Sequence, residues 1–271
     1  MISINSRNIE KVQQQAKNWV IALGFFDGVH IGHQKVIETA MLEAKSRQLP
    51  LALMSFNTHP INILSNGNRK VEKLMTLCTK EKKLRDLEID IFYLVDFTKS
   101  FASLPPQCFV EEYLVKLGVV HVVAGFDYSY GFQGSGNLSQ IPFYSYGAIS
   151  VSEVGCINYK NEKISSTAIR QRLKQRMVHE IPHFLGHHYI SKAKLVGQEL
   201  EIIEDTAIPA TGCYKVILKN QMFDYPINVF VSQTGSIICL HRIPKELQGE
   251  VYIEWLALKK ISKLSLTEKI M

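Results

Sequence analysis

One stretch of this sequence, residues 20–33, limits the fold of the chain more than any other. It begins with four apolar residues, Val20–Leu23, which is typical of a buried strand. Two glycines and an aspartate interrupt the apolar run, and from Gln34 onward apolar residues recur at helical spacing. The sequence therefore predicts a strand over 20–24, a loop that carries His30 and His33, and a helix over 34–47.

The position of the two histidines indicates an anion site. In an open α/β sheet the turn from strand to helix lies at the carboxyl edge of the sheet, where ligands bind. A helix start also offers free backbone N–H groups and the positive end of the helix dipole, which suit phosphate. Gly32 between the two imidazoles lacks a Cβ and allows close approach. Two ordinary surface histidines in a loop would show the same spacing. The flanking residues therefore distinguish a phosphate site from such a loop.

Those flanking residues form a long match to a known family. The segment Gly24-Phe-Phe-Asp-Gly-Val-His-Ile-Gly-His33 resembles the GxFDGVHxGH signature of the bacterial FAD synthetases, a branch of the HxGH nucleotidylyltransferases. The resemblance implies an α/β fold with a Rossmann-like parallel sheet. It also implies transfer of AMP from ATP to FMN, giving FAD and pyrophosphate. The roles that it implies are catalytic for His30 and His33 and ATP-binding for Gly24, Phe25, Phe26, Asp27 and Gly32.

A second loop follows the next predicted strand, 51–56. The order strand, helix, strand predicts a parallel pair with a right-handed crossover. The segment Ser55–Pro60 resembles the family's Thr-Phe-x-x-His-Pro motif, with Ser in place of Thr. The resemblance implies that Phe56, His59 and Pro60 contact FMN. Without it, His59 reads as a loop histidine before a proline.

A third loop follows the most strand-like segment of the chain, 119–124, which is rich in valine. The segment Gly125–Gly131 resembles the family's GxDFxFG motif, with tyrosine at both later phenylalanine positions. The resemblance implies that Phe126, Asp127 and Tyr130 bind FMN, the rings beside the flavin and the carboxylate at its N–H groups. The alternative is a turn whose aromatic rings pack inward. The family's basic pair is replaced by Phe132 and Gln133, which removes one possible phosphate contact.

A fourth segment, Ile164–Arg170, reproduces the family's ISSTxIR motif and opens a predicted helix to about residue 176. Hydroxyl groups in a first helical turn cap free N–H groups, and a guanidinium can hold two phosphate oxygens at once. The resemblance implies that Ser165, Ser166 and Thr167 bind ATP and that Arg170 is catalytic. A simple helix cap is the alternative.

The remaining elements of the first domain are predicted as scaffold. They are an edge strand within 1–18, a loop over 61–75 with a basic tip, a helix over 80–88, a strand over 89–95, a helix over 103–118 and a strand over 149–154. The segment that begins at Thr76 resembles the family's "LT-x-x-x-EK" helix start and is also assigned to scaffold.

The last third of the chain alternates like strands, at 214–218, 227–231, 237–240 and 251–256. Bifunctional members of the family carry a C-terminal riboflavin kinase domain, a small β-barrel whose PTxN motif holds ATP and magnesium. Here Ile208–Tyr214 resembles the entry to a barrel strand, but no PTxN is present. We therefore predict a nucleotidylyltransferase domain at 1–185 and a degenerate kinase-like β domain at 186–271, without riboflavin kinase activity.

The composition of the chain limits the classes of binding partner and the cellular location that we expect. The chain has 271 residues and 31 basic against 25 acidic side chains, a net charge of +6, without a dense basic block. This mild positive charge fits an anionic small ligand, and without a dense basic block we expect no nucleic-acid partner. ATP with Mg²⁺ and FMN are the partners that the family resemblance implies. Five scattered cysteines indicate reduced thiols and a cytoplasmic protein. No apolar run approaches ~18 residues, and residues 1–17 are polar, so we expect no membrane span and no signal peptide.

The sequence also allows a zinc site, a different acceptor or a non-catalytic binding function. His183, His187 and His188 are spaced like zinc ligands, but no Cys or acidic side chain accompanies them, so no protein-held metal is predicted. A nucleotidylyltransferase acting on another phosphate or phosphonate would keep the chemistry and change the acceptor. A regulator that binds flavin or nucleotide without catalysis would keep the binding sites and lose the transfer reaction.

Overall fold

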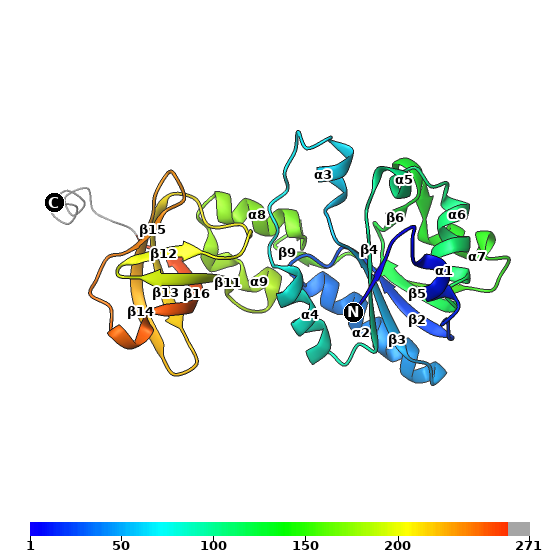
Figure 1. The fold of residues 1–271 in the computed structure, drawn as a ribbon, viewed down its shortest axis with the longest axis horizontal. Helices are drawn as coiled ribbons and strands as arrows, with labels where there is room; N and C mark the ends of the chain where they lie inside the picture. The colour runs from blue at the N-terminus through cyan, green and yellow to red at the C-terminus, as the bar shows by residue number, and fades with distance from the viewer. Residues whose placement is uncertain (260–271) are drawn as a thin grey trace. The chain divides into compact units, whose positions relative to one another are not determined.

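The computed structural model describes residues 1–259, and residues 260–271 of the predicted second domain lie outside the described residues (Figure 1). The chain divides into two compact units. The first holds Met1–Val71 and Leu77–Ile157, and the second holds Glu72–Thr76 and the chain from Asn158 onward.

A six-stranded parallel sheet forms the centre of the first unit, in the order β1-β4-β3-β2-β5-β8. Its strands are β1 (Ile2–Ile4), β2 (Trp19–Leu23), β3 (Leu51–Phe56), β4 (Ile91–Val95), β5 (Val119–Gly125) and β8 (Ser150–Val154). The predicted parallel α/β sheet is thereby confirmed. The chain leaves β2 toward β3 on one side and reaches β5 on the other, so the strand order reverses between β2 and β5. Ligands of open α/β sheets bind at that point, outside the carboxyl ends of the strands.

Both faces of this sheet are buried, which explains the continuous apolar runs of its strands. One face carries Ile21, Leu23 and Val122 in a core with Phe109 and Tyr113. The other face is covered by α2 (Ile31–Arg47), which buries Val36, Ile37, Ala40 and Ala44 and contacts β2 and β5. The helix is held at the carboxyl end of β2 by this packing.

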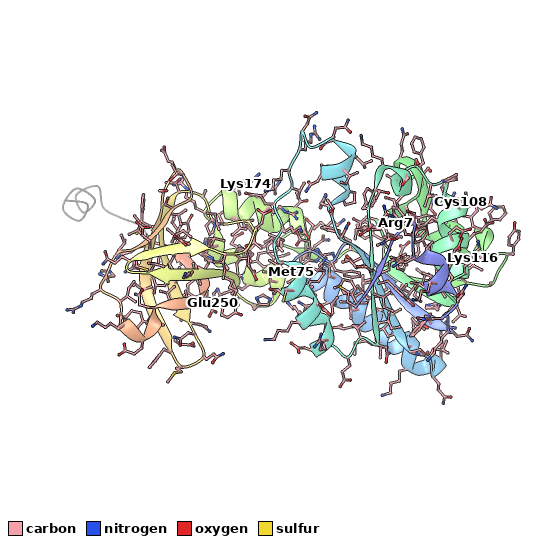
Figure 2. The ribbon with its side chains drawn as sticks, in the orientation of Figure 1. Arg7, Met75, Cys108, Lys116, Lys174 and Glu250 are labelled. Carbon is pink, nitrogen blue, oxygen red and sulfur yellow. The ribbon has the colours of Figure 1, made fainter. Side chains whose placement is uncertain are left out.

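The other elements of the first unit are short. They are α1 (Ile9–Gln13), α3 (Pro60–Leu64), α4 (Leu77–Asp86), α5 (Lys99–Ala102), α6 (Pro106–Val110), α7 (Ile141–Tyr144), the hairpin β6 (Ser129–Tyr130) with β7 (Gly136–Asn137), and the 3₁₀ turns Phe132–Gly134 and Leu138–Gln140. The prediction of a loop over 61–75 was wrong in part, because Pro60 starts α3. The helix predicted over 103–118 is instead α6 followed by the π-helical turn Glu111–Val115. Figure 2 labels Cys108 on α6 and Lys116 just after that turn.

A closed antiparallel barrel dominates the second unit, in the order β11-β12-β15-β14-β13-β16. Its strands are β11 (Tyr189–Val196), β12 (Glu199–Ile202), β13 (Gly212–Lys219), β14 (Asp224–Val231), β15 (Ile237–Cys239) and β16 (Gly249–Leu258). The four predicted strands are confirmed, and β11 and β12 are additional. Trp255, Tyr189 and Tyr214 are fully buried. Glu250, labelled in Figure 2, pairs with Lys192 on the adjacent strand at 2.8 Å.

The same unit contains the hairpin β9 (Asn158–Tyr159) with β10 (Glu162–Lys163), the helices α8 (Ser166–Lys174) and α9 (Pro182–Leu185), and the 3₁₀ turns Val178–Glu180 and Lys245–Leu247. Residues 158–185 therefore pack in the unit that contains the barrel, although the motif at 164–170 was predicted as part of the domain 1–185. In the described part of the chain no helix is both long and apolar enough to cross a membrane.

Candidate functional site

The loop between β2 and α2 follows an unusual backbone path. Phe26 and Val29 both have positive φ angles, 53° and 45°, although both side chains are fully buried. Such angles are costly for a β-branched residue and tend to cluster at functional sites. A Cβ added to Gly24 would lie 2.9 Å from Cζ of the Phe26 ring, so any other residue there would require the buried ring to move. The ring of Phe26 also packs near His33, with centroids 5.2 Å apart.

His30 and His33 occupy the start of α2. His30 is the N-cap, and its Nδ1 accepts the backbone N–H of His33 at 3.2 Å. The two imidazole rings stack, with centroids 3.6 Å apart and planes 14° from parallel. The helix begins at Ile31, three residues before the predicted start, because His30 itself supplies the cap. Both rings therefore stand at a helix N-terminus beside the carboxyl end of β2, where phosphate is favoured.

The second predicted loop lies next to the first. His59 is the N-cap of α3, with its Nδ1 accepting the N–H of Ile61 at 3.2 Å, and Pro60 is the first residue of that helix. The ring of His59 packs edge-on against Phe25, with centroids 4.8 Å apart. Phe56 ends β3 and contacts the ring of Phe97 at 5.1 Å. The structure thus brings together the segments that carry Phe25, Phe56 and His59.

The third loop, after β5, divides its predicted residues between surface and core. Phe126 is 43% exposed and Asp127 is exposed. Tyr130 is instead buried in the core, with its ring 5.0 Å from that of Phe109. Burial raises the pKa of the Tyr130 hydroxyl. This placement agrees with the alternative of inward-packed aromatic rings for Tyr130, whereas Phe126 and Asp127 remain accessible.

A buried lysine of the first unit was missed by sequence reasoning. Lys80 on α4 is 5% exposed, and its Nζ donates to the carbonyl oxygen of Phe25 at 2.7 Å. Ser55 Oγ donates to the same oxygen at 2.8 Å. The spacing from Lys80 to Leu84, four residues later, places both on one face of the helix, but nothing in the local sequence indicates the distant carbonyl that Lys80 contacts.

The fourth segment lies in the second unit, at the start of α8. Ser165 is the N-cap and its Oγ accepts the N–H of Ala168 at 3.1 Å, while Ser166 and Thr167 form the first turn. Arg170 is one turn further on, and its Nε donates to the carbonyl oxygen of Glu72 at 2.7 Å. The cap predicted for Ser165 is present.

Arg172, two residues after Arg170, has a structural role that the sequence did not reveal. It is 8% exposed and pairs with Glu162 at 2.7 Å and Glu180 at 3.2 Å. The Arg172 hydrogen bond holds the pKa of the Glu162 carboxyl below its usual range. Its guanidinium also lies 3.8 Å from the centre of the Phe184 ring. These contacts fix α8 within its unit.

The histidines weighed as zinc ligands have other contacts. His183 stacks on Tyr159 with centroids 4.3 Å apart, and His187 Nδ1 lies 2.7 Å from the carbonyl oxygen of His188. Within residues 1–259, no group of three or more His, Cys, Asp and Glu side chains is arranged to hold a metal ion.

The chain is similar to known proteins over most of its length. Residues 12–168 match the family model described as FAD synthetase. The chain is 40% identical to a bifunctional riboflavin kinase/FMN adenylyltransferase of Listeria monocytogenes over 211 residues, 73% of this chain and 67% of that protein. It is 38% identical to the protein of the same name in Bacillus subtilis, over 68% of this chain and 58% of that one. An FAD synthetase of Listeria monocytogenes is 30% identical over 72% of this chain and 80% of its own length.

A solved structure resembles the fold over nearly the whole chain. A crystal structure described as a macrolide-efflux protein from Streptococcus pneumoniae superposes with a TM-score of 0.81 and 28% sequence identity. The match covers 95% of this chain and 98% of that one. The combination of the parallel sheet and the barrel is therefore found in another protein of similar length.

Proposed function

This chain belongs to the FAD synthetase family, and from that membership and the geometry of the β2–α2 loop we propose how it acts. The chain is an FMN adenylyltransferase: it transfers the AMP group of ATP to FMN, giving FAD and pyrophosphate. The observation that carries the proposal is the stacked pair of His30 and His33 at the N-terminus of α2, beside the point where the strand order reverses.

The reaction is a direct displacement at phosphorus. An oxygen of the FMN phosphate attacks the α-phosphorus of ATP, a new P–O bond forms, and the bond to the oxygen that bridges to the β-phosphorus breaks. The electron pair of that bond leaves with pyrophosphate. Such chemistry needs positioning and charge stabilisation rather than a protein nucleophile.

The β2–α2 loop and the start of α2 supply the contacts at the reacting phosphorus. His30, His33 and the positive end of the helix dipole at the start of α2 stabilise the charge that develops on the α-phosphate. The backbone of Gly24–Asp27 and Gly32 passes close to ATP. Gly24 supports this role because a side chain there would collide with Phe26 and change the loop.

FMN is the acceptor in this proposal. Phe56, His59 and Pro60 after β3, and Phe126 and Asp127 after β5, bind its flavin. Their location supports the assignment, because β3, β2 and β5 are neighbouring parallel strands whose carboxyl ends share one edge of the sheet. Tyr130 supports the same loop from the core.

The leaving phosphates are assigned to the start of α8. Ser165, Ser166 and Thr167 at the start of α8 and the guanidinium of Arg170 hold the β- and γ-phosphates. The hydroxyl-rich helix start and the fork-shaped donor set of a guanidinium suit two phosphate oxygens. ATP enters as its magnesium complex, because Mg²⁺ is usually carried by substrate phosphates and one or two carboxylates.

We assign the transferase to residues 1–185 and a degenerate kinase-like domain to residues 186–271. The family match runs to residue 168 and the first barrel strand begins at Tyr189, which supports this division. The proposal also includes a cytoplasmic location and the loss of riboflavin kinase activity.

The test is an incubation of the purified chain with FMN and MgATP, followed by flavin fluorescence and by separation of the flavins. FAD fluoresces less than FMN, so the signal falls as FAD and pyrophosphate accumulate in equal amounts. A panel of other phosphate acceptors with labelled ATP runs beside it. Transfer of AMP to one of those acceptors but not to FMN, or binding of both substrates without turnover, contradicts the proposal.

A further inference from the structure

Lys80 is a buried cation at the edge of the proposed active site, outside the motifs that define it. Its side chain lies on α4, and its Nζ is 2.7 Å from the carbonyl oxygen of Phe25 and 3.3 Å from Ser55 Oγ. The same Nζ lies 4.8 Å from the centre of the Phe25 ring. Lys80 therefore joins α4 to the start of the β2–α2 loop and to the end of β3.

Burial of a lysine is expensive unless polar partners compensate for the lost water. Here a carbonyl oxygen, a hydroxyl group and the face of an aromatic ring provide that compensation. An apolar side chain of similar length would fill the same space without this cost. The lysine is thus not required for packing alone, and its location calls for another role.

The chain around Phe25 explains what the contact does. The next residue, Phe26, has a φ of 53°, and Val29 has a φ of 45°. A loop with two such residues stays in one conformation only where its surroundings fix it. The carbonyl of Phe25 is the last backbone group before these residues, and two side chains, Lys80 and Ser55, donate to it. The loop ends at His30, so its path sets where both imidazoles stand.

We propose that Lys80 is a positioning residue for the β2–α2 loop, which holds His30 and His33 in the geometry needed for AMP transfer by fixing the carbonyl of Phe25. This inference rests on the proposed function. It adds a residue of a helix that the sequence assigned to scaffold.

The test compares Lys80→Met, Lys80→Arg and Ser55→Ala with the matched control Lys82→Met, which removes an exposed cation from the same helix. Small displacements of reacting groups can cost about 100-fold in rate. Lys80→Met should therefore lower kcat for FAD formation by between about 10-fold and 100-fold, with the KM for FMN unchanged within about 2-fold. Lys80→Arg should recover part of that loss. Lys82→Met should equal the parent protein.

A second readout does not depend on activity. The imidazole NMR signals of His30 and His33, recorded without ATP or FMN, should shift in Lys80→Met and stay in place in Lys82→Met. If Lys80→Met fails to fold, Ser55→Ala, which removes the other donor to the same oxygen, carries the same test with a smaller loss. This readout stands even if the parent protein makes no FAD, so the two proposals fail separately.

Two results would overturn the inference. One is a kcat for FAD formation that is the same in Lys80→Met and in the control Lys82→Met. The other is a loss of kcat with the His30 and His33 signals unmoved, which would mean that the ammonium group acts on the substrate directly.

Discussion

The imidazole rings of His30 and His33 are stacked at 3.6 Å while Nδ1 of His30 accepts the backbone N–H of His33. The two histidines are therefore one structural element. The cap fixes the ring of His30, and the ring of His30 supports that of His33. Substitutions at the two positions have different consequences, because only His30 also caps the N-terminus of α2.

Replacing His33 with Ala should lower kcat by about 100-fold or more, since removing one contact to developing charge costs roughly 3–4 kcal/mol in other enzymes. FMN binding, followed by its fluorescence, should change little. Glu38→Ala, an exposed position on the same helix, serves as the control. Equal turnover in His33→Ala and the parent would remove His33 from the reaction.

Replacing His30 separates its two roles. His30→Ala should lower the free energy of unfolding by about 1 kcal/mol, because an N-cap acceptor is lost. His30→Asn restores a cap acceptor and should unfold in urea like the parent protein. Both variants should lose turnover, since neither has an imidazole. A catalytically active His30→Asn would show that capping is the whole role of this residue.

Arg170→Lys keeps the charge on α8 and changes its shape. An ammonium group cannot grip two oxygens in the plane that a guanidinium provides. We expect kcat/KM for ATP to fall at least about tenfold, which corresponds to about 1.4 kcal/mol. Arg176→Lys, an exposed position near the end of the same helix, is the control. Full activity of Arg170→Lys would identify Arg170 as a structural donor to the Glu72 carbonyl.

Riboflavin offered with MgATP should remain riboflavin, while FMN offered with MgATP becomes FAD. Phosphoryl transfer depends on fixing the ATP phosphates and Mg²⁺ beside the acceptor hydroxyl. In bifunctional members of the family the PTxN motif holds ATP and magnesium, and this chain lacks that motif. Thr206 and Asn228 are the nearest Thr and Asn candidates, but they do not form it. Chromatographic separation of the flavins measures both reactions. FMN appearing from riboflavin as fast as FAD appears from FMN would contradict the prediction.

His121 makes the first unit sensitive to acid. Its ring is 2% exposed on β5, between Ser150 and Ser152 and beside Glu43 and Arg47 of α2. Burial, and then the Arg47 charge, lower its pKa from the ordinary value of 6.5, against the opposing effect of Glu43. The unfolded chain therefore binds this proton more readily than the folded chain does.

The free energy of unfolding should consequently fall as the pH drops below about 6.5, down to the pKa of the folded state. Urea unfolding at a series of pH values measures it. His121→Gln, which cannot ionise, should show a flatter dependence over this range. An identical pH dependence in the two proteins would assign the effect to other groups.

Much of the sheet could be predicted because its strands are buried on both faces, and continuous apolar runs such as Val119–Ala124 mark them clearly. The helix starts were less accurate. The start of α2 depends on the Nδ1 of His30, and α3 begins at Pro60 inside a segment of mostly polar residues. Both starts depend on a hydrogen bond to a capping side chain, and hydrophobic periodicity does not reveal such a bond.

The site could be predicted only as a set of loops. Nothing in the sequence indicates that Phe26 and Val29 take positive φ angles, since neither residue favours them. Lys80 was missed because its partner is a backbone carbonyl 55 positions away. Tyr130 was predicted to bind FMN, and the contact of its ring with Phe109 in the core was not predicted. These outcomes depend on tertiary contacts that local spacing does not encode.

The closed barrel has a consequence for how this family can change. Because β11 pairs with β16, the ring of hydrogen bonds is complete without help from any connecting segment. The connection from β12 to β13 can then be shortened or rebuilt while the strands keep their partners. Catalytic residues located in such a connection can therefore be lost without loss of the barrel fold. A lineage can therefore discard one catalytic activity by editing a single turn and still inherit an intact domain.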